Sequence, residues 1–266
     1  MDAFSYELKN NVLNAVPEPM VSIRTSAYNH AGYIRECIEG ILNQKTDFKF
    51  EYIIGEDFST DGTREIVFEY AEKYPTIVKV IHKPNGGHGD AVTCGLQHAT
   101  GKYFKVVDSD DWVSHDYVSK MVDSMIENQS DVVCCDMEYV DDDENRTYSS
   151  GGDFSVVHVD EHPEIITINN SACNKLIKRK CFEHIEFPKG IWYEDLGSIP
   201  MILSEAKIVS KVSEPLYFYY QRSGSISHTE NSKIFDIYCS LEKVRQYLSE
   251  QGKPASMLKA WMSMYV

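Results

Sequence analysis

Acidic residues stand at three predicted strand ends of this 266-residue sequence, and their spacing suits metal binding. One group, Asp108-Ser109-Asp110-Asp111, directly follows the mostly apolar residues 104–107. Burying such a strand end is unfavourable unless a cation or a solvent-filled cleft compensates the charges. Alternate residues of an extended segment project to one side, so Asp108 and Asp110 can converge while Ser109 points away. Two such carboxylates can bind Mg²⁺ or Mn²⁺ while a diphosphate supplies further ligands.

The other two acidic groups are Glu56-Asp57 and Glu194-Asp195. Ligands of open α/β sheets bind outside the carboxyl ends of the strands, and we expect the Asp57 and Asp108 groups to lie side by side there. A carboxylate in this place suits a base or a ribose, because it accepts N–H and O–H hydrogen bonds. The simpler alternative for the Asp108 group is a solvated turn before a helix. Within that group, we expect Asp111 to cap a helix that begins near Ser114.

The composition excludes two classes of partner. With a net charge of −15, general binding to nucleic acid and a broad electrostatic contact with membranes are both unfavourable. The seven cysteines include no C-x-x-C pair, which favours reduced thiols in a cytosolic protein. The first 16 residues are not a signal peptide, and no apolar stretch is long enough to span a bilayer. We therefore expect a soluble, cytoplasmic protein.

Strands and helices alternate in the first 136 residues, which predicts an α/β fold with a doubly wound, mainly parallel sheet. A weak helical pattern covers residues 3–14, and a polar loop of residues 24–30 follows the first strand. The expected strands are residues 20–23, 52–55, 78–81, 104–107 and 132–135. The expected helices are residues 31–43, 63–74 and 91–98, and one that contains residues 118–126.

The alternation ends after Asp136. We expect a β-hairpin or mobile insertion within residues 137–165, with its acidic run in a solvated loop. The further expected helices are residues 171–183, 197–204, 232–250 and 254–265, and the further strands are residues 208–212 and 216–220. The helical pattern still runs at Val266, so we expect the protein to continue. We divide the chain into a first half (1–136), a second half (137–230) and C-terminal helices (231–266).

Several short motifs stand in the order seen in glycosyltransferase family 2. They are Val21-Ser22-Ile23…Tyr28-Asn29, Glu56-Asp57-x-Ser59-Thr60-Asp61-Gly62-Thr63, Asn85-Gly86-Gly87, Ala99-Thr100-Gly101-Lys102-Tyr103 and Val107-Asp108-Ser109-Asp110-Asp111-Trp112. Downstream, the chain resembles capsule and cell-wall polysaccharide members of the family through Asn174-Lys175-Leu176, Phe187-Pro188-x-Gly190, Glu194-Asp195-Leu196 and Tyr217…Arg222-x-Gly224-Ser225-Ile226. The resemblance covers residues 20–228 and implies the Rossmann-like GT-A fold, with an acceptor-side extension, and inversion at the sugar.

The resemblance also implies roles for individual residues. A nucleotide-sugar donor, commonly a UDP-sugar, would lie against Ala27, Tyr28, Asn29, Glu56, Asp57, Asn85, Gly86, Gly87, His88, Asp108 and Ser109. Asp108 and Asp110 would bind Mn²⁺ or Mg²⁺. Asp195, with Glu194 beside it as a second catalytic residue, would deprotonate a hydroxyl of the acceptor, a glycan or a lipid-linked glycan. Such an enzyme would lie in the cytoplasm or peripherally at the inner membrane face. Inversion requires such a carboxylate opposite the leaving nucleotide.

Two departures from the family pattern affect the donor site. The family usually has Pro-Thr where this chain has Ser26-Ala27, which predicts a less rigid first loop. It usually has Asp-Asp-Gly-Ser where this chain has Glu56-Asp57-Phe58-Ser59, so Phe58 replaces a glycine and could reshape the pocket for the base.

Other candidate residues have a structural and a functional interpretation. Asp57 could cap a turn, and His88 with its neighbouring glycines could serve only the loop. Arg222 and His228 are either surface residues or contacts of the diphosphate. Trp192 and Tyr193 are either core aromatics or a platform for an acceptor sugar. The basic cluster Lys178-Arg179-Lys180, with Lys175, is expected on the solvated face of a helix, and contact with an anionic acceptor is the alternative.

Two rival functions have sequence arguments of their own. A sugar-1-phosphate nucleotidyltransferase would need a Gly-rich, basic loop near the N-terminus, and residues 20–30 contain one arginine and no such loop. A non-catalytic nucleotide-sugar-binding module of a larger synthase is the other alternative. The intact D-x-D motif and Glu194-Asp195 argue against it.

Overall fold

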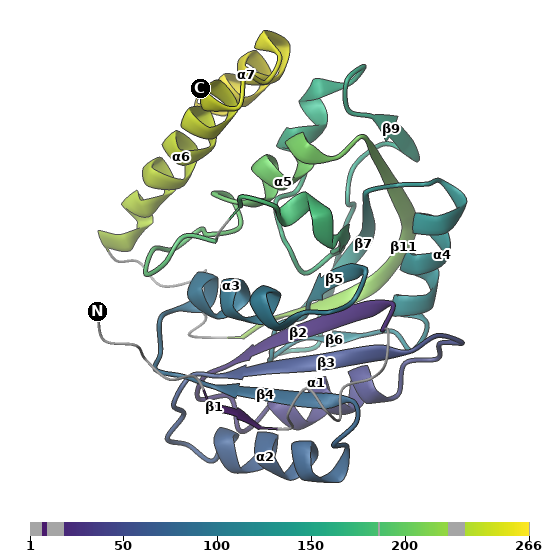
Figure 1. The fold of residues 1–266 in the computed structure, drawn as a ribbon, viewed down its shortest axis with the longest axis vertical. Helices are drawn as coiled ribbons and strands as arrows, with labels where there is room; N and C mark the ends of the chain where they lie inside the picture. The colour runs from purple at the N-terminus through teal and green to yellow at the C-terminus, as the bar shows by residue number, and fades with distance from the viewer. Residues whose placement is uncertain (1–6, 10–18, 186, 223–231, 266) are drawn as a thin grey trace.

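The chain folds around one mixed sheet with helices on both faces (Figure 1). The computed structural model describes residues 7–9, 19–185, 187–222 and 232–265. Within these residues the sheet has 11 strands, and the main path runs in the order β1-β4-β3-β2-β5-β10-β7-β11-β6. The strands of the first half are β1 (Glu7–Lys9), β2 (Val21–Ala27), β3 (Phe50–Glu56), β4 (Val78–His82), β5 (Tyr103–Val106) and β6 (Trp112–Val113). Those of the second half are β7 (Val132–Asp141), β8 (Arg146–Ser149), β9 (Val156–His158), β10 (Lys175–Lys178) and β11 (Ile208–Gln221).

The helices divide the core into two layers. The first layer lies under α1 (Ile34–Leu42), α2 (Thr63–Lys73) and α4 (Tyr117–Glu127). The second lies under α3 (His88–His98), α5 (Ile199–Glu205), α6 (Asp236–Glu250) and α7 (Ala255–Met262). Alternate residues of each central strand enter opposite layers, as the period of two requires, so Ile53 packs in the second layer and Ile54 in the first.

The parallel centre of the sheet agrees with the predicted α/β alternation. β2 pairs in parallel with β3 and β5, and β3 pairs in parallel with β4. All four carboxyl ends therefore lie at one edge, where ligands of such sheets bind. However, β2 separates β3 from β5, so the Asp57 and Asp108 groups do not follow neighbouring strands as expected. β2 also extends to Ala27, so Arg24 and Thr25 are buried within the strand. The loop expected at residues 24–30 is therefore shorter.

The predicted helix over residues 171–183 is wrong. Residues 175–178 form β10, which runs antiparallel between β5 and β7, and a 3₁₀ turn (Arg179–Phe182) follows. Leu176 packs in one core layer and Ile177 in the other, as in a strand buried on both faces. A two-residue apolar run carries no period that separates strand from helix. The basic residues consequently do not share a helix face, and Lys175 is buried.

Other elements match the sequence more closely. β7 and β8 form the expected hairpin, and residues 142–144 of the acidic run are exposed at its turn. The two strands expected at 208–220 are one strand, β11, with register shifts around Pro215. Residues 7–9 of the supposed N-terminal helix form β1, antiparallel to β4; most of the remaining residues 3–14 lie outside the described part. The expected C-terminal helices are present as α6 and α7.

Two sequence-based statements about the whole chain also have structural counterparts. All seven cysteines are free thiols, and six of them are buried while Cys239 is exposed. Among the described residues, no helix combines the length and the apolar character needed to cross a membrane. One sheet runs through both proposed halves of the chain, so their division stays a prediction about function.

Candidate active site

Asp57 lies at the carboxyl end of β3, anchored by main chain and by a buried cation. Its N–H donates to the carbonyl of Ala27 at the end of β2, at 3.0 Å. The ammonium of Lys83, which follows β4, lies 2.9 Å from Oδ1 of Asp57, and both residues are buried. Burial raises the pKa of Asp57, and the charge of Lys83 opposes this rise. The cap before α2 comes instead from Asp61, which accepts from the N–H and hydroxyl of Thr63.

The loops after β2 and β3 are joined by hydrogen bonds. The N–H of Asn29 donates to Ser59 Oγ at 3.1 Å, and the Asn29 side-chain oxygen accepts from the N–H of Thr60 at 2.9 Å. Phe58 has a φ of +57°, the left-handed region that favours glycine, which explains the usual glycine of the family motif. Its ring lies 4.2 Å from the His82 ring, and 48% of the residue is exposed. Tyr28 is similarly exposed and free to cover a ligand.

Glu56, which the sequence predicts as a donor contact, has protein partners for both carboxylate oxygens. It is fully buried, and Oε1 accepts from the N–H of Ser59 at 2.6 Å. Oε2 lies 2.5 Å from Nδ1 of His82. Because both oxygens are occupied by the protein, Glu56 shapes the loop of Asp57.

Asp111 is not a helix cap. The helix α4 begins at Tyr117 after Asp116, and Asp111 precedes the short strand β6. Its carboxylate is buried: Oδ2 accepts from the hydroxyl of Tyr217 at 2.6 Å, and Oδ1 accepts from the N–H of Tyr220 at 2.8 Å. Burial and the nearby Asp108 and Asp110 raise its pKa. Asp111 therefore ties the D-x-D loop to β11.

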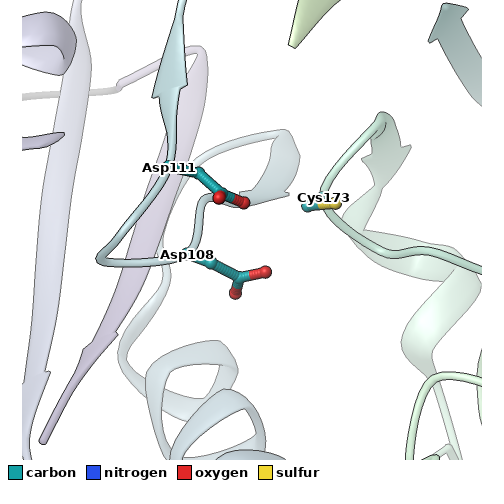
Figure 2. Close-up of side chains that lie close together, drawn as sticks. All are labelled: Asp108, Asp111 and Cys173. Atoms are coloured by element: carbon teal, nitrogen blue, oxygen red, sulfur yellow. The ribbon is translucent and has the colours of Figure 1, made fainter. Parts of the chain in front are cut away.

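Figure 2 shows the side chains of Asp108 and Asp111 close to Cys173. One ligand atom of each lies within 4.8 Å of the others. Both oxygens of Asp111 are hydrogen-bonded, and burial raises the pKa of the Cys173 thiol, so neither is a ready ligand for a hard cation. Oδ1 of Asp108, in contrast, is buried without a hydrogen-bond partner among the described residues. That oxygen fits a divalent cation.

Asp110, the second predicted metal ligand, is held by Arg222 in this structure. The Arg222 Nε lies 3.0 Å from Oδ2 of Asp110, and its terminal nitrogen donates to Nε2 of His30 at 2.9 Å. Nδ1 of the same imidazole lies 2.5 Å from Ser109 Oγ. Burial lowers the pKa of His30, which suits the neutral ring that this arrangement requires. Arg222 thus reaches the D-x-D loop, and its contact with the diphosphate stays a prediction.

Asp195 combines one fixed oxygen with one open oxygen. Oδ2 accepts from the N–H of Ala172 at 2.8 Å, whereas Oδ1 is buried with no hydrogen-bond partner among the described residues. Burial first, and then repulsion from Glu194, raises the pKa of Asp195 to about 7. Nε2 of His88 lies 3.7 Å from Asp108 and 4.0 Å from Glu194, so this ring links the D-x-D loop to the Glu194-Asp195 loop.

The Gly-rich segment before α3 allows close packing at this junction. The side chain of Asn85 accepts from the N–H of Gly87, which has a φ of +82°. A Cβ on Gly86 would overlap the Asp90 carboxylate, and a Cβ on Gly89 would overlap the carbonyl oxygen of Pro188. Gly86 and Gly89 therefore allow close packing, and a contact of Gly86 or Gly87 with the donor stays a prediction.

Replacing Gly89 by Ala is expected to destabilise the fold by roughly 1–3 kcal/mol, because the new methyl group must displace the chain at Pro188. That chain leads to Glu194, so activity should fall as well. Thermal unfolding and a transfer assay measure the two effects. Gly40→Ala in α1, where a Cβ meets nothing within 4 Å, is the control and should be neutral or stabilising. Equal stability of the two variants would contradict the packing argument.

The loop before Asp195 is anchored on α6. The N–H of Trp192 donates to Asp236 at 2.9 Å, and Ser240 Oγ donates to the carbonyl of Tyr193 at 2.9 Å. Tyr193 has a φ of +61° and is 39% exposed, so it is not a core aromatic. His228, the other predicted contact, lies outside the described residues.

Three residues of this site were missed in the sequence: Lys83, His30 and Tyr217. Lys83 follows β4 just as Asp57 follows β3, so comparing strand ends could have found it. His30 and Tyr217 carry no such signal, because their partners lie 79 and 106 or more positions away in the chain.

The mixed sheet, with acidic residues at the carboxyl ends of its parallel strands, is a GT-A-like α/β fold. The chain belongs to glycosyl transferase family 2, whose model matches residues 22–186. It is accordingly a glycosyltransferase that uses a nucleotide-sugar donor.

One relative and two solved structures illustrate the similarity. The chain is 31% identical over 225 residues to the glycosyltransferase GlyG of Streptococcus pneumoniae serotype 4, covering 79% of this chain and 74% of the relative. S. aureus TarS 1–349 in complex with UDP-GlcNAc aligns with a TM-score of 0.73 and 24% identity, over 86% of this chain and 66% of TarS 1–349. The mannosyltransferase PcManGT from Pyrobaculum calidifontis, in complex with GDP-Man and Mn²⁺, aligns with a TM-score of 0.58 and 16% identity. The alignment covers 97% of this chain and 72% of the PcManGT chain.

Proposed function

We propose that the protein is an inverting, metal-dependent enzyme that transfers a hexose or N-acetylhexosamine from a UDP-sugar to a hydroxyl of a bacterial capsule or cell-wall glycan. The observation that carries this proposal is the carboxylate of Asp195, with Oδ2 fixed by Ala172 and Oδ1 open. A general base needs a fixed orientation and an open acceptor atom. The half that binds the donor is residues 1–136, and the acceptor half with the base is residues 137–230.

The donor side supports a diphosphate nucleotide. Asp57 offers a carboxylate at the end of β3, and exposed Tyr28 lies at the end of β2 beside it. The structural neighbour TarS binds UDP-GlcNAc, which makes UDP-sugars the first donors to test. Asn85, Gly87 and His88 belong to the loop that faces Asp108 through His88.

Asp108 and Asp110 would hold the cation. The open Oδ1 of Asp108 fits this role, and Asp110 joins it if Arg222 exchanges its carboxylate partner for a phosphate. The cation would neutralise the charge of the departing diphosphate. PcManGT, which shares the fold, is in complex with GDP-Man and Mn²⁺ in its solved structure. Trp192 and Tyr193 would contact the acceptor, next to the base.

A donor screen tests this proposal. Purified protein is incubated with Mn²⁺ and with UDP-, GDP- and CDP-sugars in turn, and release of the nucleoside diphosphate is measured. We expect turnover with a UDP-hexose or UDP-N-acetylhexosamine and a strong loss with EDTA. Binding of UDP without any turnover, in the presence of glycan acceptors, would favour a non-catalytic module of a larger synthase.

The transfer rate is expected to depend on pH through Asp195. A base acts in its ionised form, and the pKa of Asp195 is raised to about 7 by burial and by Glu194, while His88 opposes and Asp108 adds to the rise. The rate should therefore fall about tenfold per pH unit well below pH 7 and level off above it. Initial rates at saturating donor from pH 5 to pH 9 measure this dependence. A rate that is flat between pH 5 and pH 7 would contradict the assignment.

A further inference from the structure

Lys83 is a buried amine between two carboxylates at the edge of the donor site. It follows β4 and is 1% exposed. Its Nζ lies 2.9 Å from Oδ1 of Asp57 and 2.9 Å from Oδ2 of Asp90 on α3. The other oxygen of Asp90 pairs with Lys189 at 2.6 Å. Asp90 therefore has two cationic partners, Lys83 and Lys189. Lys83 also pairs with Asp57.

The ion pair orients the carboxylate of Asp57 but does not fill its capacity to accept hydrogen bonds. The main chain of Asp57 is fixed by Ala27, and Oδ1 is fixed by Lys83, so the carboxylate plane has little freedom to rotate. Apart from this ion pair, Oδ1 is buried and has no hydrogen-bond partner in the part of the chain that the structure describes. An ionised carboxylate only accepts hydrogen bonds, so the group that completes this site must donate one.

A lysine within β4 shows what a purely structural ion pair looks like. Lys79 lies four residues before Lys83, on the same face of the sheet, and pairs with the buried Glu51 of β3. There the remaining carboxylate oxygen accepts from Ser22 Oγ and from the N–H and hydroxyl of Thr100. Glu51 is saturated by the protein, whereas Asp57 is not.

We propose that Lys83 is a positioning residue that makes the donor site selective for a nucleobase with a ring N–H, uracil in the UDP-sugar, over cytosine. Uracil carries a hydrogen on N3, and cytosine carries a lone pair there, which an oxygen of a fixed carboxylate repels. Lys83 acts through Asp57 and does not touch the base. The inference rests on the proposed function, since it deepens the assignment of Asp57 to the donor.

The fixed orientation is what converts this difference into selectivity. A carboxylate that is free to rotate or to take up a proton can present a donor to N3 of cytosine as well. The ammonium of Lys83 favours the ionised carboxylate, which presents acceptors only. Sites built to bind an N–H reject analogues that lack it, because the buried polar group is then left unpaired.

The test compares UDP with CDP, two pyrimidine nucleotides of nearly equal shape. Calorimetry with Mn²⁺ gives Kd for both nucleotides with the wild type, Lys83→Met and the matched control Lys79→Met. We expect the wild type to prefer UDP on the order of 100-fold. In Lys83→Met the preference should fall below about tenfold, mainly because UDP binding weakens, whereas Lys79→Met should keep the wild-type ratio. Lys83→Arg, which keeps the charge, should restore much of it.

Each of the other outcomes contradicts either the proposed function or the role of Lys83. A wild type that binds neither nucleotide contradicts the proposed function itself. A wild type that prefers UDP, together with a folded Lys83→Met of unchanged preference, overturns only the role of Lys83. Loss of preference in both lysine variants would mean that any buried pair of β4 has this effect, and also overturns it. If Lys83→Met does not fold, Lys83→Gln is used with the same criteria.

Discussion

Replacing Asp195 by Asn is expected to lower kcat about 10²- to 10⁴-fold while leaving the binding of UDP unchanged. Asn can still accept the hydrogen bond from Ala172, so the loop should keep its position. It cannot take a proton from an acceptor hydroxyl, which is the step that the open Oδ1 is placed to perform. Steady-state kinetics of sugar transfer and calorimetry with UDP measure the two quantities.

The same variant should be at least as stable as the wild type. The folded-state pKa of Asp195 is raised to about 7, so the cost of its ionisation to folding grows as the pH rises from the ordinary Asp pKa towards 7 and is fully present above it. Removing the charge relieves this effect and the repulsion from Glu194. Thermal unfolding at pH 8 should therefore give an equal or higher Tm together with the loss of activity, a pattern of functional rather than structural damage.

Asp160→Asn is the matched control, because Asp160 is exposed and lies in the same half of the chain. It should change neither kcat nor Tm. Two results would remove Asp195 from the mechanism: a kcat within threefold of the wild type, or a loss of activity that is fully explained by weaker UDP binding. Restoration of the rate in Asp195→Glu would favour the general-base role further, since Glu supplies the same group.

The parallel centre of the fold was predictable because long periodic segments decide it. β2, β3, β4 and β5 with α1, α2 and α3 follow the expected order, although β2 extends further than its polar residues suggested. The strand β10 was not predictable, because its two apolar residues become informative only once β5 and β7 lie on either side. Tertiary pairing, not local preference, makes residues 175–178 a strand.

The candidate site divides in the same way. Strand-end acids such as Asp57 and Asp108 could be found, because a charged residue after a buried strand is visible in the chain order. The sequence could not show which acid keeps an oxygen without a hydrogen bond and which acid has protein partners for both oxygens. Glu56 is occupied by Ser59 and His82, and Asp111 is occupied by residues of β11 that lie more than 100 positions later. Long-range hydrogen bonds leave no local pattern.

This distinction gives Tyr217 a role that the sequence alone does not suggest. Its hydroxyl donates to the buried Oδ2 of Asp111 at 2.6 Å and accepts from the N–H of Asp108 at 3.1 Å. Burial and Asp111 raise the pKa of this hydroxyl, so it stays a donor throughout the useful pH range. One oxygen atom thereby connects β11, the buried acid and the proposed metal ligand.

Tyr217→Phe is accordingly expected to destabilise the protein by roughly 2–4 kcal/mol, because a carboxylate oxygen and a main-chain N–H both lose their buried partner. The fold should survive, since the ring still packs against Tyr117. With Asp108 released, Mn²⁺-dependent UDP binding should weaken at least tenfold. Chemical unfolding measures the first effect, and calorimetry with UDP at several Mn²⁺ concentrations measures the second.

Tyr139→Phe on β7 is the matched control, because the structure gives the Tyr139 hydroxyl no hydrogen bond within the described chain, although its ring packs on Tyr219. It should lose little stability and no UDP affinity. If Tyr217→Phe weakened UDP binding equally with and without Mn²⁺, the hydroxyl would act on the nucleotide pocket as a whole. If excess Mn²⁺ restored the affinity for UDP, the hydroxyl would act through Asp108. A misplaced Asp108 weakens the binding of the cation, and a higher Mn²⁺ concentration compensates for this by mass action. The geometry requires the second result.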